Sequence, residues 1–242
     1  QACRARGVTT VLDNTWGAGL AFKPFDLLAD GGSVAVDVSA HALTKYPSGG
    51  GDVLMGSIIT TDNAVHMRIK LTHMRLGIGI GANDAELVLR SLSSMALRYH
   101  AHDVSARVLA AALQRQPAVV QLLHPAFAGA PGHAHWQQLC GAAHQGQGAA
   151  AGLFSVVVDA QFDQAAIDRL CDSLQLFKLG YSWGGPMSLV VPYDIDSMRA
   201  GGRGALQAGT VVRFCVGLED TQDLLRDLAQ AWEKAFGQAW VQ

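Results

Sequence analysis

A single lysine, Lys45, has the surroundings of a residue that does chemistry. It follows the apolar run Val34–Val38 and precedes the glycine-rich stretch Pro47–Asp52. The run predicts a buried strand, and burial of an ammonium group near the end of a strand is costly and lowers its pKa. Because only the free amine attacks a carbonyl, such a lysine can form a Schiff base. The residues alone leave a second interpretation open, in which Lys45 is an ordinary surface lysine at a strand end.

Two further charged residues stand in or beside apolar runs. Asp13 ends the run Val8–Leu12, and open α/β sheets bind their ligands at the carboxyl ends of strands. Asp13 could equally cap a turn. Arg213 follows Val211 and Val212, so we expect it to be buried and to require an anionic partner. That partner could be a substrate carboxylate or an acid of the protein itself.

Short motifs occur along almost the whole chain in one order. The main ones are Asp13–Trp16, Asp37–Asp52, Tyr181–Gly185 and Gly209–Asp220, with weaker matches at Asn83–Leu87 and His124–Pro125. Through these motifs the chain resembles the pyridoxal-phosphate (PLP) enzymes of cysteine and methionine metabolism, and most of all their β-lyase branch. The resemblance implies an α/β fold, namely the C-terminal part of a fold-type I PLP-dependent transferase-like large domain followed by a smaller α/β C-terminal domain.

A PLP enzyme needs few protein groups, because the cofactor itself is the electron sink. The resemblance implies that Lys45 is the catalytic lysine, linked covalently to pyridoxal 5'-phosphate. It further implies that Asp13 keeps the ring nitrogen protonated and that the Thr44 hydroxyl donates to the phosphate. Related γ-lyases carry a serine two residues before this threonine. Its replacement here by Ala42 favours the β-lyase branch.

The substrate residues implied by the resemblance lie in the second half of the chain. The matching arginine of the family binds the α-carboxylate of the amino acid, so Arg213 is the expected substrate ligand. Ser182 and Trp183 would lie at the edge of the substrate and the cofactor. Without the resemblance, Trp183 would be read as an aromatic anchor of the core. A lone histidine in the lysine motif, His41, is more often structural, and we assign it no role.

The reaction implied by the resemblance is elimination at a carbon–sulfur bond. L-Cystathionine would be cleaved to homocysteine, pyruvate and ammonia, a step of methionine biosynthesis. Two alternatives remain open. One is another reaction of the same family, such as that of cystathionine γ-lyase, cystathionine γ-synthase, methionine γ-lyase or O-acylhomoserine sulfhydrylase. The other is a non-catalytic fragment of the fold. The family also implies a homo-oligomer, in particular a homotetramer.

The composition of the 242 residues argues against other classes of function. The formal net charge is −2 and no basic cluster occurs, so we expect no nucleic-acid partner. Half the residues are hydrophobic and 16% are charged, which is enough for a sizeable core. No apolar stretch is long enough to span a membrane. The four cysteines and the paired histidines lack metal-type spacing. We expect a soluble, cytoplasmic enzyme without a metal site.

Hydrophobic periodicity predicts the organisation of the chain. A long helix from Asp84 to Pro117 should link two domains, residues 1–92 and 93–242. The stretch Gly141–Gly152, rich in Gly, Ala and Gln, is expected to be a mobile loop. Strands are predicted at 8–12, 34–38, 53–60, 119–123, 153–158, 187–191 and 211–216, and helices at 62–75, 135–140, 162–174 and 221–236, the last capped by Asp220 or Thr221.

The beginning of the chain suggests truncation. It starts at Gln1 without a methionine and enters a core-type strand almost directly. Family members carry a long portion before the aspartate that matches Asp13. That portion supplies the phosphate cup, the aromatic residue stacked on the cofactor and groups from a neighbouring subunit. We therefore expect the site within these residues to be incomplete.

Overall fold

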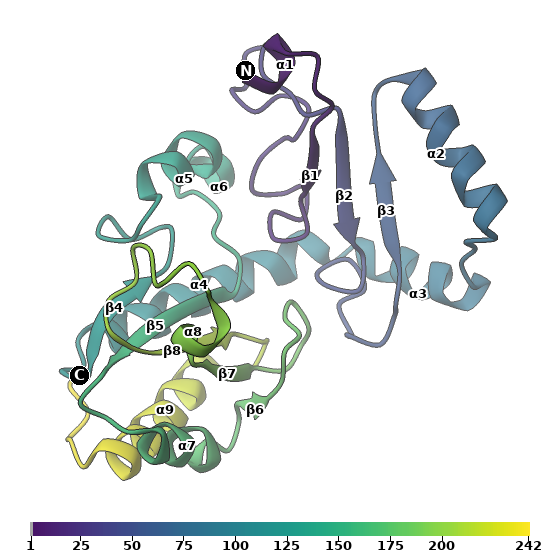
Figure 1. Ribbon diagram of the computed structural model, residues 1–242. Helices are drawn as coiled ribbons and strands as arrows, with labels where there is room; N and C mark the ends of the chain where they lie inside the picture. The colour runs from purple at the N-terminus through teal and green to yellow at the C-terminus, as the bar shows by residue number, and fades with distance from the viewer. Residues whose placement is uncertain (1) are drawn as a thin grey trace. The chain divides into compact units, whose positions relative to one another are not determined.

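The computed structural model describes residues 2–242, which form two compact units (Figure 1). Unit 1 comprises Gln1–Leu97 and Gln137–Ala149, and unit 2 comprises Arg98–Trp136 and Ala150–Gln242. Each unit contains its own β-sheet together with helices, so the predicted α/β character is confirmed in both.

Unit 1 contains a three-stranded sheet in the order β1 (Val11–Asp13), β2 (Val38–Ala42), β3 (Gly56–Ile59). Strands β1 and β2 are parallel, whereas β2 and β3 are antiparallel. Asp13, the last residue of β1, pairs with Ala40 in the middle of β2. Asp13 therefore lies at the carboxyl end of a parallel strand, the edge at which α/β sheets bind ligands.

The strand predicted at 34–38 was wrong, because β2 begins where that prediction ends. Residues 34 and 36 pair with a preceding loop. The Val34 carbonyl accepts a hydrogen bond from the Leu27 amide at 2.9 Å, and the Val36 amide donates to the Pro24 carbonyl at 3.0 Å. Apolar β-branched residues favour extended backbone, but their pattern does not specify the segment with which they pair.

Helix α2 (Asn63–Leu76) has both of its ends defined by local chemistry. The Asp62 side chain accepts a hydrogen bond from the Val65 amide at 2.9 Å and so caps the first turn. Gly77 ends the helix in the left-handed conformation, at φ 65°. The prediction of a helix at 62–75 is confirmed. The short helices α1 (Ala2–Ala5), α5 (His133–Cys140) and α6 (Ala143–Gly146) are the other minor elements in and next to this unit.

The long helix expected from Asp84 is interrupted. It consists of α3 (Ala82–Leu92) and α4 (Met95–Gln114). Between them the Ser93 and Ser94 hydroxyls donate to the carbonyls three residues earlier, at 3.1 and 3.2 Å. Such local side-chain bonds compete with the helical hydrogen bonds, which accounts for the break at this serine pair.

Unit 2 is built on a five-stranded sheet in the order β4-β5-β8-β7-β6. Neighbouring strands are antiparallel except β6 and β7, which are parallel. Four of the five strands lie within two residues of their predicted positions, and β6 was not predicted. The strands are β4 (Val119–Leu123), β5 (Leu153–Asp159), β6 (Lys178–Leu179), β7 (Leu189–Tyr193) and β8 (Gly209–Cys215).

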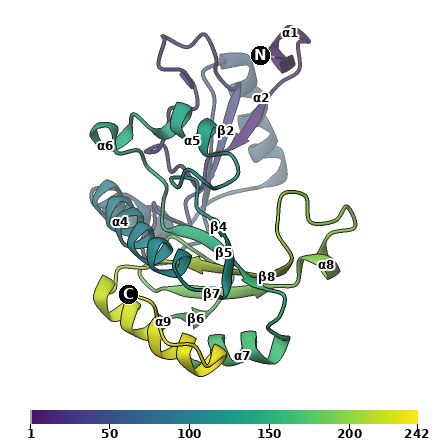
Figure 2. The same ribbon diagram turned by 90° about the vertical axis from the view of Figure 1, so that its left-hand side faces the viewer.

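One face of this sheet carries the main hydrophobic core of unit 2 (Figures 1 and 2). Phe154 of β5 and Val212 and Phe214 of β8 are buried there against helices α4, α7 (Gln164–Ser173) and α9 (Thr221–Phe236). Asp220 caps α9 by accepting hydrogen bonds from two amides of the first turn, as predicted.

The opposite face of the sheet has a smaller apolar cluster. It contains Val157, Val211 and Ile195, the first residue of α8 (Ile195–Met198). Because side chains alternate between the faces of a strand, Arg213 lies on the same face as Val211, away from the helices. This face therefore holds the charged residue that the sequence singled out.

The segment 141–152, predicted to be a mobile loop, is fixed at its end. The Ala150 amide donates to the Asp103 carboxylate at 3.0 Å, and the Gly152 carbonyl accepts a hydrogen bond from the Val216 amide at 2.8 Å. Ala150 is fully buried. The mobile-loop interpretation was therefore wrong for this part of the segment.

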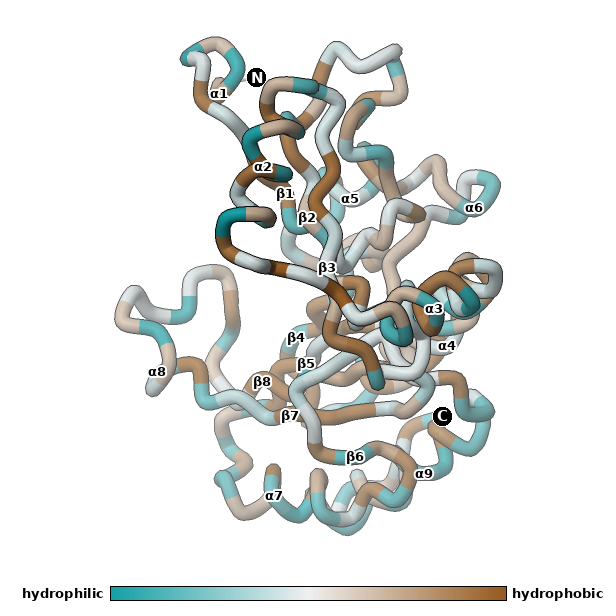
Figure 3. Tube along the Cα trace, turned by 90° about the vertical axis from the view of Figure 1, so that its right-hand side faces the viewer, coloured by the Kyte–Doolittle hydropathy of each residue, from teal (hydrophilic) through white to brown (hydrophobic). Residues whose placement is uncertain are grey.

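Unit 1 exposes many hydrophobic side chains. Figure 3 shows hydrophobic residues along β3 and in the segment that follows α2, and α2 itself contains no buried residue. The side chains that are at least 47% exposed include Ile58, Ile59, Met74, Ile78 and Ile80. Hydrophobic residues in such numbers on one unit mark a surface that a monomeric protein would ordinarily cover.

Candidate active site

Two hydrogen bonds from Thr15 keep the Asp13 carboxyl ionised. The amide and the hydroxyl of Thr15 both donate to Asp13 Oδ1, at 2.9 and 2.5 Å. These two bonds lower the pKa of the Asp13 carboxyl below its usual value, with the hydroxyl bond as the larger cause. The side chain itself remains exposed at the end of β1. Asp13 therefore presents a charged carboxylate at the ligand-binding edge of the sheet.

Thr15 also ties Asp13 to the lysine segment. Its hydroxyl accepts a hydrogen bond from the Ala42 amide at 2.9 Å, and Ala42 is the last residue of β2. Thr15 is 5% exposed, so this bridge is shielded from solvent. Through Thr15, the Asp13 carboxylate is therefore connected to Ala42, where the turn that contains Lys45 begins. No pattern in the sequence indicated this role of Thr15.

Lys45 lies in a turn just beyond β2. Its amide donates to the Ala42 carbonyl at 3.2 Å, and its carbonyl accepts from the Gly49 amide at 3.3 Å. The next residue, Tyr46, is fully buried and anchors the turn, while Lys45 is half-buried. The lysine is therefore partly shielded and sits on a fixed backbone, although it follows the strand β2 and not the predicted run 34–38.

Thr44 contacts the backbone ahead of β3. Its hydroxyl accepts a hydrogen bond from the Met55 amide at 3.3 Å and lies 3.5 Å from the Met55 carbonyl oxygen. Ser48 donates from its hydroxyl to the Thr44 carbonyl at 2.8 Å. These contacts hold the lysine turn against the segment that leads into β3. The sequence-based role of Thr44 as a phosphate ligand stays a prediction.

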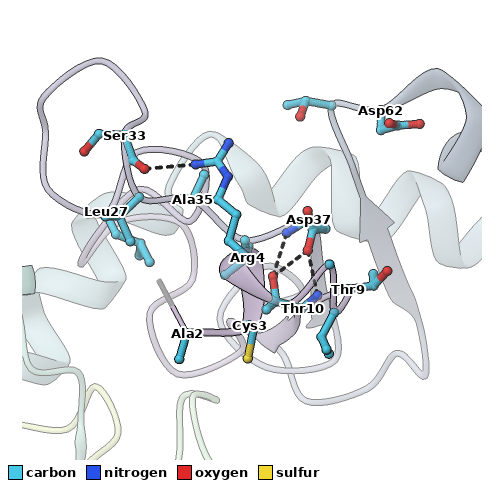
Figure 4. Close-up of a pocket in the computed structure, with 15 residues that line it drawn as sticks. Ala2, Cys3, Arg4, Thr9, Thr10, Leu27, Ser33, Ala35, Asp37 and Asp62 are labelled. Carbon is cyan, nitrogen blue, oxygen red and sulfur yellow. Dashed lines mark hydrogen bonds between the residues drawn. The ribbon is translucent and has the colours of Figure 1, made fainter.

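Two cavities lie in unit 1. One of about 470 Å³ is lined by Asp13, His41, Met55, Ile58, His73 and Ile80, among others, so one predicted site residue borders it. Burial lowers the pKa of the His41 imidazole, and the Asp13 charge partly opposes that shift. A larger cavity of about 620 Å³ contains none of the predicted site residues. Figure 4 shows it with Arg4 bonded to the Ser33 carbonyl and Thr10 bonded to Asp37.

In unit 2, Arg213 holds the backbone of the loop at 180–187, which we call the Trp183 loop. Its Nη2 donates to the Tyr181 carbonyl at 2.8 Å and reaches the Gly180 carbonyl at 3.4 Å. The guanidinium carbon lies 5.6 Å from the ring centroid of Tyr193, a cation–π arrangement. Within residues 2–242, Nε and Nη1 of Arg213 make no hydrogen bond, and they remain open to a ligand.

The alternative of an acidic protein partner for Arg213 does not hold among the described residues. The ion pairs in that part of the chain join other residues. Glu219 accepts hydrogen bonds from Ser188, and Asp220 caps α9, so the two acids nearest in sequence are engaged elsewhere. The half-buried guanidinium thus lacks an anion, which is what a carboxylate-binding arginine requires before its ligand arrives.

Ser182 and Trp183 lie in the Trp183 loop, beside the carbonyls that Arg213 binds. Ser182 is exposed and Trp183 is half-buried. The Gly184 amide donates to Cys215 Sγ at 3.4 Å, which fixes the middle of the loop on β8. Unit 2 therefore brings Arg213, Ser182 and Trp183 together, while Asp13, Thr44 and Lys45 are grouped in unit 1.

Within residues 2–242, no group of three histidine, cysteine or acidic side chains is placed to hold a metal ion. No disulfide joins the four cysteines of that range, and burial raises the pKa of Cys140 and Cys171 to about 11. None of the helices described is both long enough and apolar enough to cross a membrane.

The fold and the grouped residues define the class of protein. Residues 1–233 match the model of the Cys/Met metabolism PLP-dependent enzymes, and the chain belongs to that family. The predicted family and fold class are confirmed, and pyridoxal phosphate is the family's cofactor. The chain spans about half the length of the curated relatives it matches.

Particular relatives differ in their reactions. The chain is 38% identical over 228 residues to a cystathionine beta-lyase of Bordetella avium, covering 92% of this chain and 52% of that protein. A solved methionine gamma lyase from Micromonospora echinospora is similar with a TM-score of 0.80 and 30% identity, covering 96% of this chain and 58% of that one. A cystathionine gamma synthase from Xanthomonas oryzae pv. oryzae gives a TM-score of 0.79 at 27% identity, with 98% and 58% covered.

Proposed function

We propose that this chain belongs to a PLP-dependent carbon–sulfur β-lyase with cystathionine β-lyase activity. The observation that carries the proposal is the Asp13 carboxylate, exposed at the carboxyl end of β1 and kept ionised by two hydrogen bonds from Thr15. A fixed anion is what a pyridinium nitrogen requires. Asp13 also caps the turn that follows β1, through the Thr15 amide, and its carboxylate borders a cavity at the sheet edge.

The residues of unit 1 fit the cofactor chemically. Asp13 would hold the ring nitrogen in its protonated form, Thr44 would donate to the phosphate, and Lys45 would bind the aldehyde carbon covalently. When bound, PLP supplies the electron sink for charge that develops at the α-carbon of an amino acid. The half-buried Lys45 amine, once displaced by the amino group of the substrate, would take the α-proton as a general base.

The residues of unit 2 suit recognition of the amino acid. Among the described residues, Nε and Nη1 of Arg213 make no hydrogen bond, so either can donate to an oxygen of a substrate carboxylate. Nη2 is bonded to the Trp183 loop, and the Tyr193 ring contacts the guanidinium, so these donors are held in place. Ser182 and Trp183 would then border the substrate. The thiolate at the β-carbon is the leaving group.

The preference for β- over γ-elimination rests on fewer residues. Ala42 removes a hydroxyl that γ-lyases of the family place near the phosphate. A Bordetella avium relative and one from Salmonella typhimurium are both named as cystathionine beta-lyase, at 38% and 32% identity. A γ-lyase or γ-synthase reaction is the second candidate, because the similar solved structures include a methionine gamma lyase and a cystathionine gamma synthase.

Product analysis distinguishes the two reactions. The full-length protein, loaded with PLP and incubated with L-cystathionine, should release pyruvate and homocysteine, whereas γ-elimination would release 2-oxobutyrate and cysteine. The Lys45→Ala variant is the matched control and should release neither keto acid. Detection of 2-oxobutyrate as the main product would replace the β-lyase proposal with the γ-lyase one, and the absence of both would remove the lyase proposal.

A further inference from the structure

The base of the Trp183 loop is closed by a carboxylate. Glu219 accepts two hydrogen bonds from Ser188, one from its amide at 2.7 Å and one from its hydroxyl at 2.8 Å. The Ser188 hydroxyl in turn accepts a hydrogen bond from the Gly217 amide at 2.8 Å. These three residues, which we call the clasp, join the start of β7 to the segment that follows β8.

The clasp has the chemistry of a strong and specific contact. Ser188 is fully buried, so its hydroxyl cannot exchange its partners for water. Its two donors meet both oxygens of one carboxylate, and hydrogen bonds to an ionised acceptor are about twice as strong as neutral ones. Glu219 immediately precedes the N-cap of α9, where the partial positive charge of the helix favours an anion.

The two backbone segments joined by the clasp are closely packed at Gly217. A Cβ atom added at Gly217 would lie 2.3 Å from the Pro186 carbonyl oxygen and 2.5 Å from Glu219 Oε2. The neighbouring Leu218 amide donates to the same Pro186 carbonyl at 2.8 Å. Glycine is therefore required here for close approach of the two segments, and the end of the Trp183 loop has one position on β8.

The clasp completes a row of contacts along one strand. Arg213 binds the Tyr181 carbonyl, Cys215 Sγ accepts from the Gly184 amide, and Gly217 lies against Pro186. Residues 213, 215 and 217 alternate, so they share one face of the extended backbone. The loop is thus fixed along its whole length on the face that carries the open donors of Arg213.

We propose that Glu219 is a positioning residue for substrate binding, an inference that rests on the proposed function. Through Ser188 and Gly217 it holds the Trp183 loop so that Ser182 and Trp183 lie beside the open donors of Arg213. Glu219 itself does not touch the substrate. Its loss should release the loop, weaken the grip on the α-carboxylate of the amino acid, and leave the residues of unit 1 unaffected.

Limited proteolysis tests whether the clasp holds the loop, without cofactor or substrate. Chymotrypsin cleaves after Tyr181, whose side chain is 77% exposed, only when the backbone around it can leave the sheet. Glu219→Gln keeps the shape of the side chain but places an amide group against the donors of Ser188. We expect cleavage after Tyr181 to become about tenfold faster, with cleavage after the buried Phe154 unchanged.

The control is Glu233→Gln, the same substitution at the other end of α9, where Glu233 accepts one hydrogen bond from the Trp240 amide. It should leave cleavage after Tyr181 as in the wild type. Ser188→Ala should also accelerate cleavage after Tyr181, and the double variant with Glu219→Gln should show less than the sum of the two effects, because both changes disturb the contact between the Ser188 hydroxyl and the Glu219 carboxylate. Unchanged cleavage in the Ser188→Ala variant, or equal acceleration in Glu233→Gln, would overturn the proposal. If the Glu219→Gln variant does not fold, the rate of cleavage after Tyr181 in the Ser188→Ala variant tests the proposal.

A kinetic measurement on the PLP-loaded protein tests the effect on substrate. Glu219→Gln should raise the KM for cystathionine about tenfold and change kcat less, since the lost contact orders the binding loop. A merely structural role would lower the thermal midpoint without this split between KM and kcat, and would contradict the inference. If the wild-type protein has no turnover, the proposed function fails, while the proteolysis still reports whether Glu219 holds the loop.

Discussion

At the scale of single residues, Arg213 is a half-buried cation that contacts two carbonyls and an aromatic ring but no acid among the described residues. An arginine in an apolar strand predicts a need for an anion, and both a protein acid and a ligand could meet it. The structure removes the first among the described residues and adds contacts to Gly180, Tyr181 and Tyr193. The loop carbonyls lie 32 and 33 residues away in sequence, a separation that no local pattern reports. For the same reason the hydrogen bond between Thr15 and Ala42, 27 residues apart, went unpredicted.

The Arg213→Lys variant tests whether the guanidinium binds the substrate carboxylate. Lysine keeps the positive charge but lacks the planar guanidinium and its several donors. We expect kcat/KM for cystathionine to fall by a factor that corresponds to on the order of 2–4 kcal/mol. The absorbance of the bound cofactor should stay unchanged, because the proposed cofactor residues are in unit 1. Arg115→Lys is the control, since Arg115 is exposed and bonds only its own helix. Full activity, or loss of the cofactor, would make Arg213 a structural residue.

At the scale of elements, local side-chain chemistry predicts where a helix or strand ends, and hydrophobic periodicity predicts that the element is present. Helix α9 occupies the predicted range 221–236 because its apolar stripe and its Asp220 cap agree. The strand predicted at 34–38 failed, since an extended apolar run can pair with a loop as readily as with a strand. The helix from Asp84 failed at Ser93 and Ser94, where side chains compete for backbone carbonyls. Both errors concern hydrogen-bond partners, which hydrophobic periodicity does not specify.

His124, at the end of strand β4, makes unit 2 sensitive to acid. Its ring is fully buried, Nδ1 accepts a hydrogen bond from the Ala126 amide, and Nε2 has no partner among the described residues. Burial lowers the pKa of His124 to about 4, opposed by the Asp103 charge and assisted by Arg107. The native protein thus binds fewer protons than the unfolded chain between pH 4 and 6.5, so the free energy of unfolding decreases as pH falls through that range.

The His124→Asn variant isolates this effect. Asparagine can keep the acceptor for the Ala126 amide but does not titrate. Urea unfolding between pH 7 and 4 should show a loss of stability in the wild type that is smaller in the variant, by up to about 3 kcal/mol. His135→Asn, at an exposed position, should retain the wild-type slope. Parallel pH curves for wild type and His124→Asn would contradict the assignment.

At the scale of the whole molecule, the two units differ in how much core they possess. The large cluster that contains Phe154, Phe214 and Trp232 lies entirely in unit 2. Unit 1 has a small sheet, an α2 without buried residues and many exposed hydrophobic side chains. The domain boundary predicted at residue 92, and the homotetramer implied by the family, stay predictions. The proposed cofactor residues lie in unit 1, and the proposed substrate residues lie in unit 2.

Amide exchange followed by mass spectrometry should therefore separate the units. Amides of β5 and β8 are buried in the core of unit 2 and should exchange on the order of 100-fold more slowly than those of α2. Because α2 has no tertiary burial, its helical bonds open without disturbing a core. Equal protection of α2 and of the central strands would show that the two units unfold together.

The central claim is that one lysine, Lys45, holds the cofactor. Borohydride reduces the bond between a lysine and pyridoxal phosphate to a stable secondary amine, and peptide mapping then locates the label. The account predicts loss of the visible absorption band and a pyridoxyl group on the peptide that contains Lys45. The other lysines of the chain are the internal controls: Lys23, Lys70, Lys178 and Lys234. A label on any of them in place of Lys45, or no label after the full-length protein is loaded with the cofactor, would contradict the account.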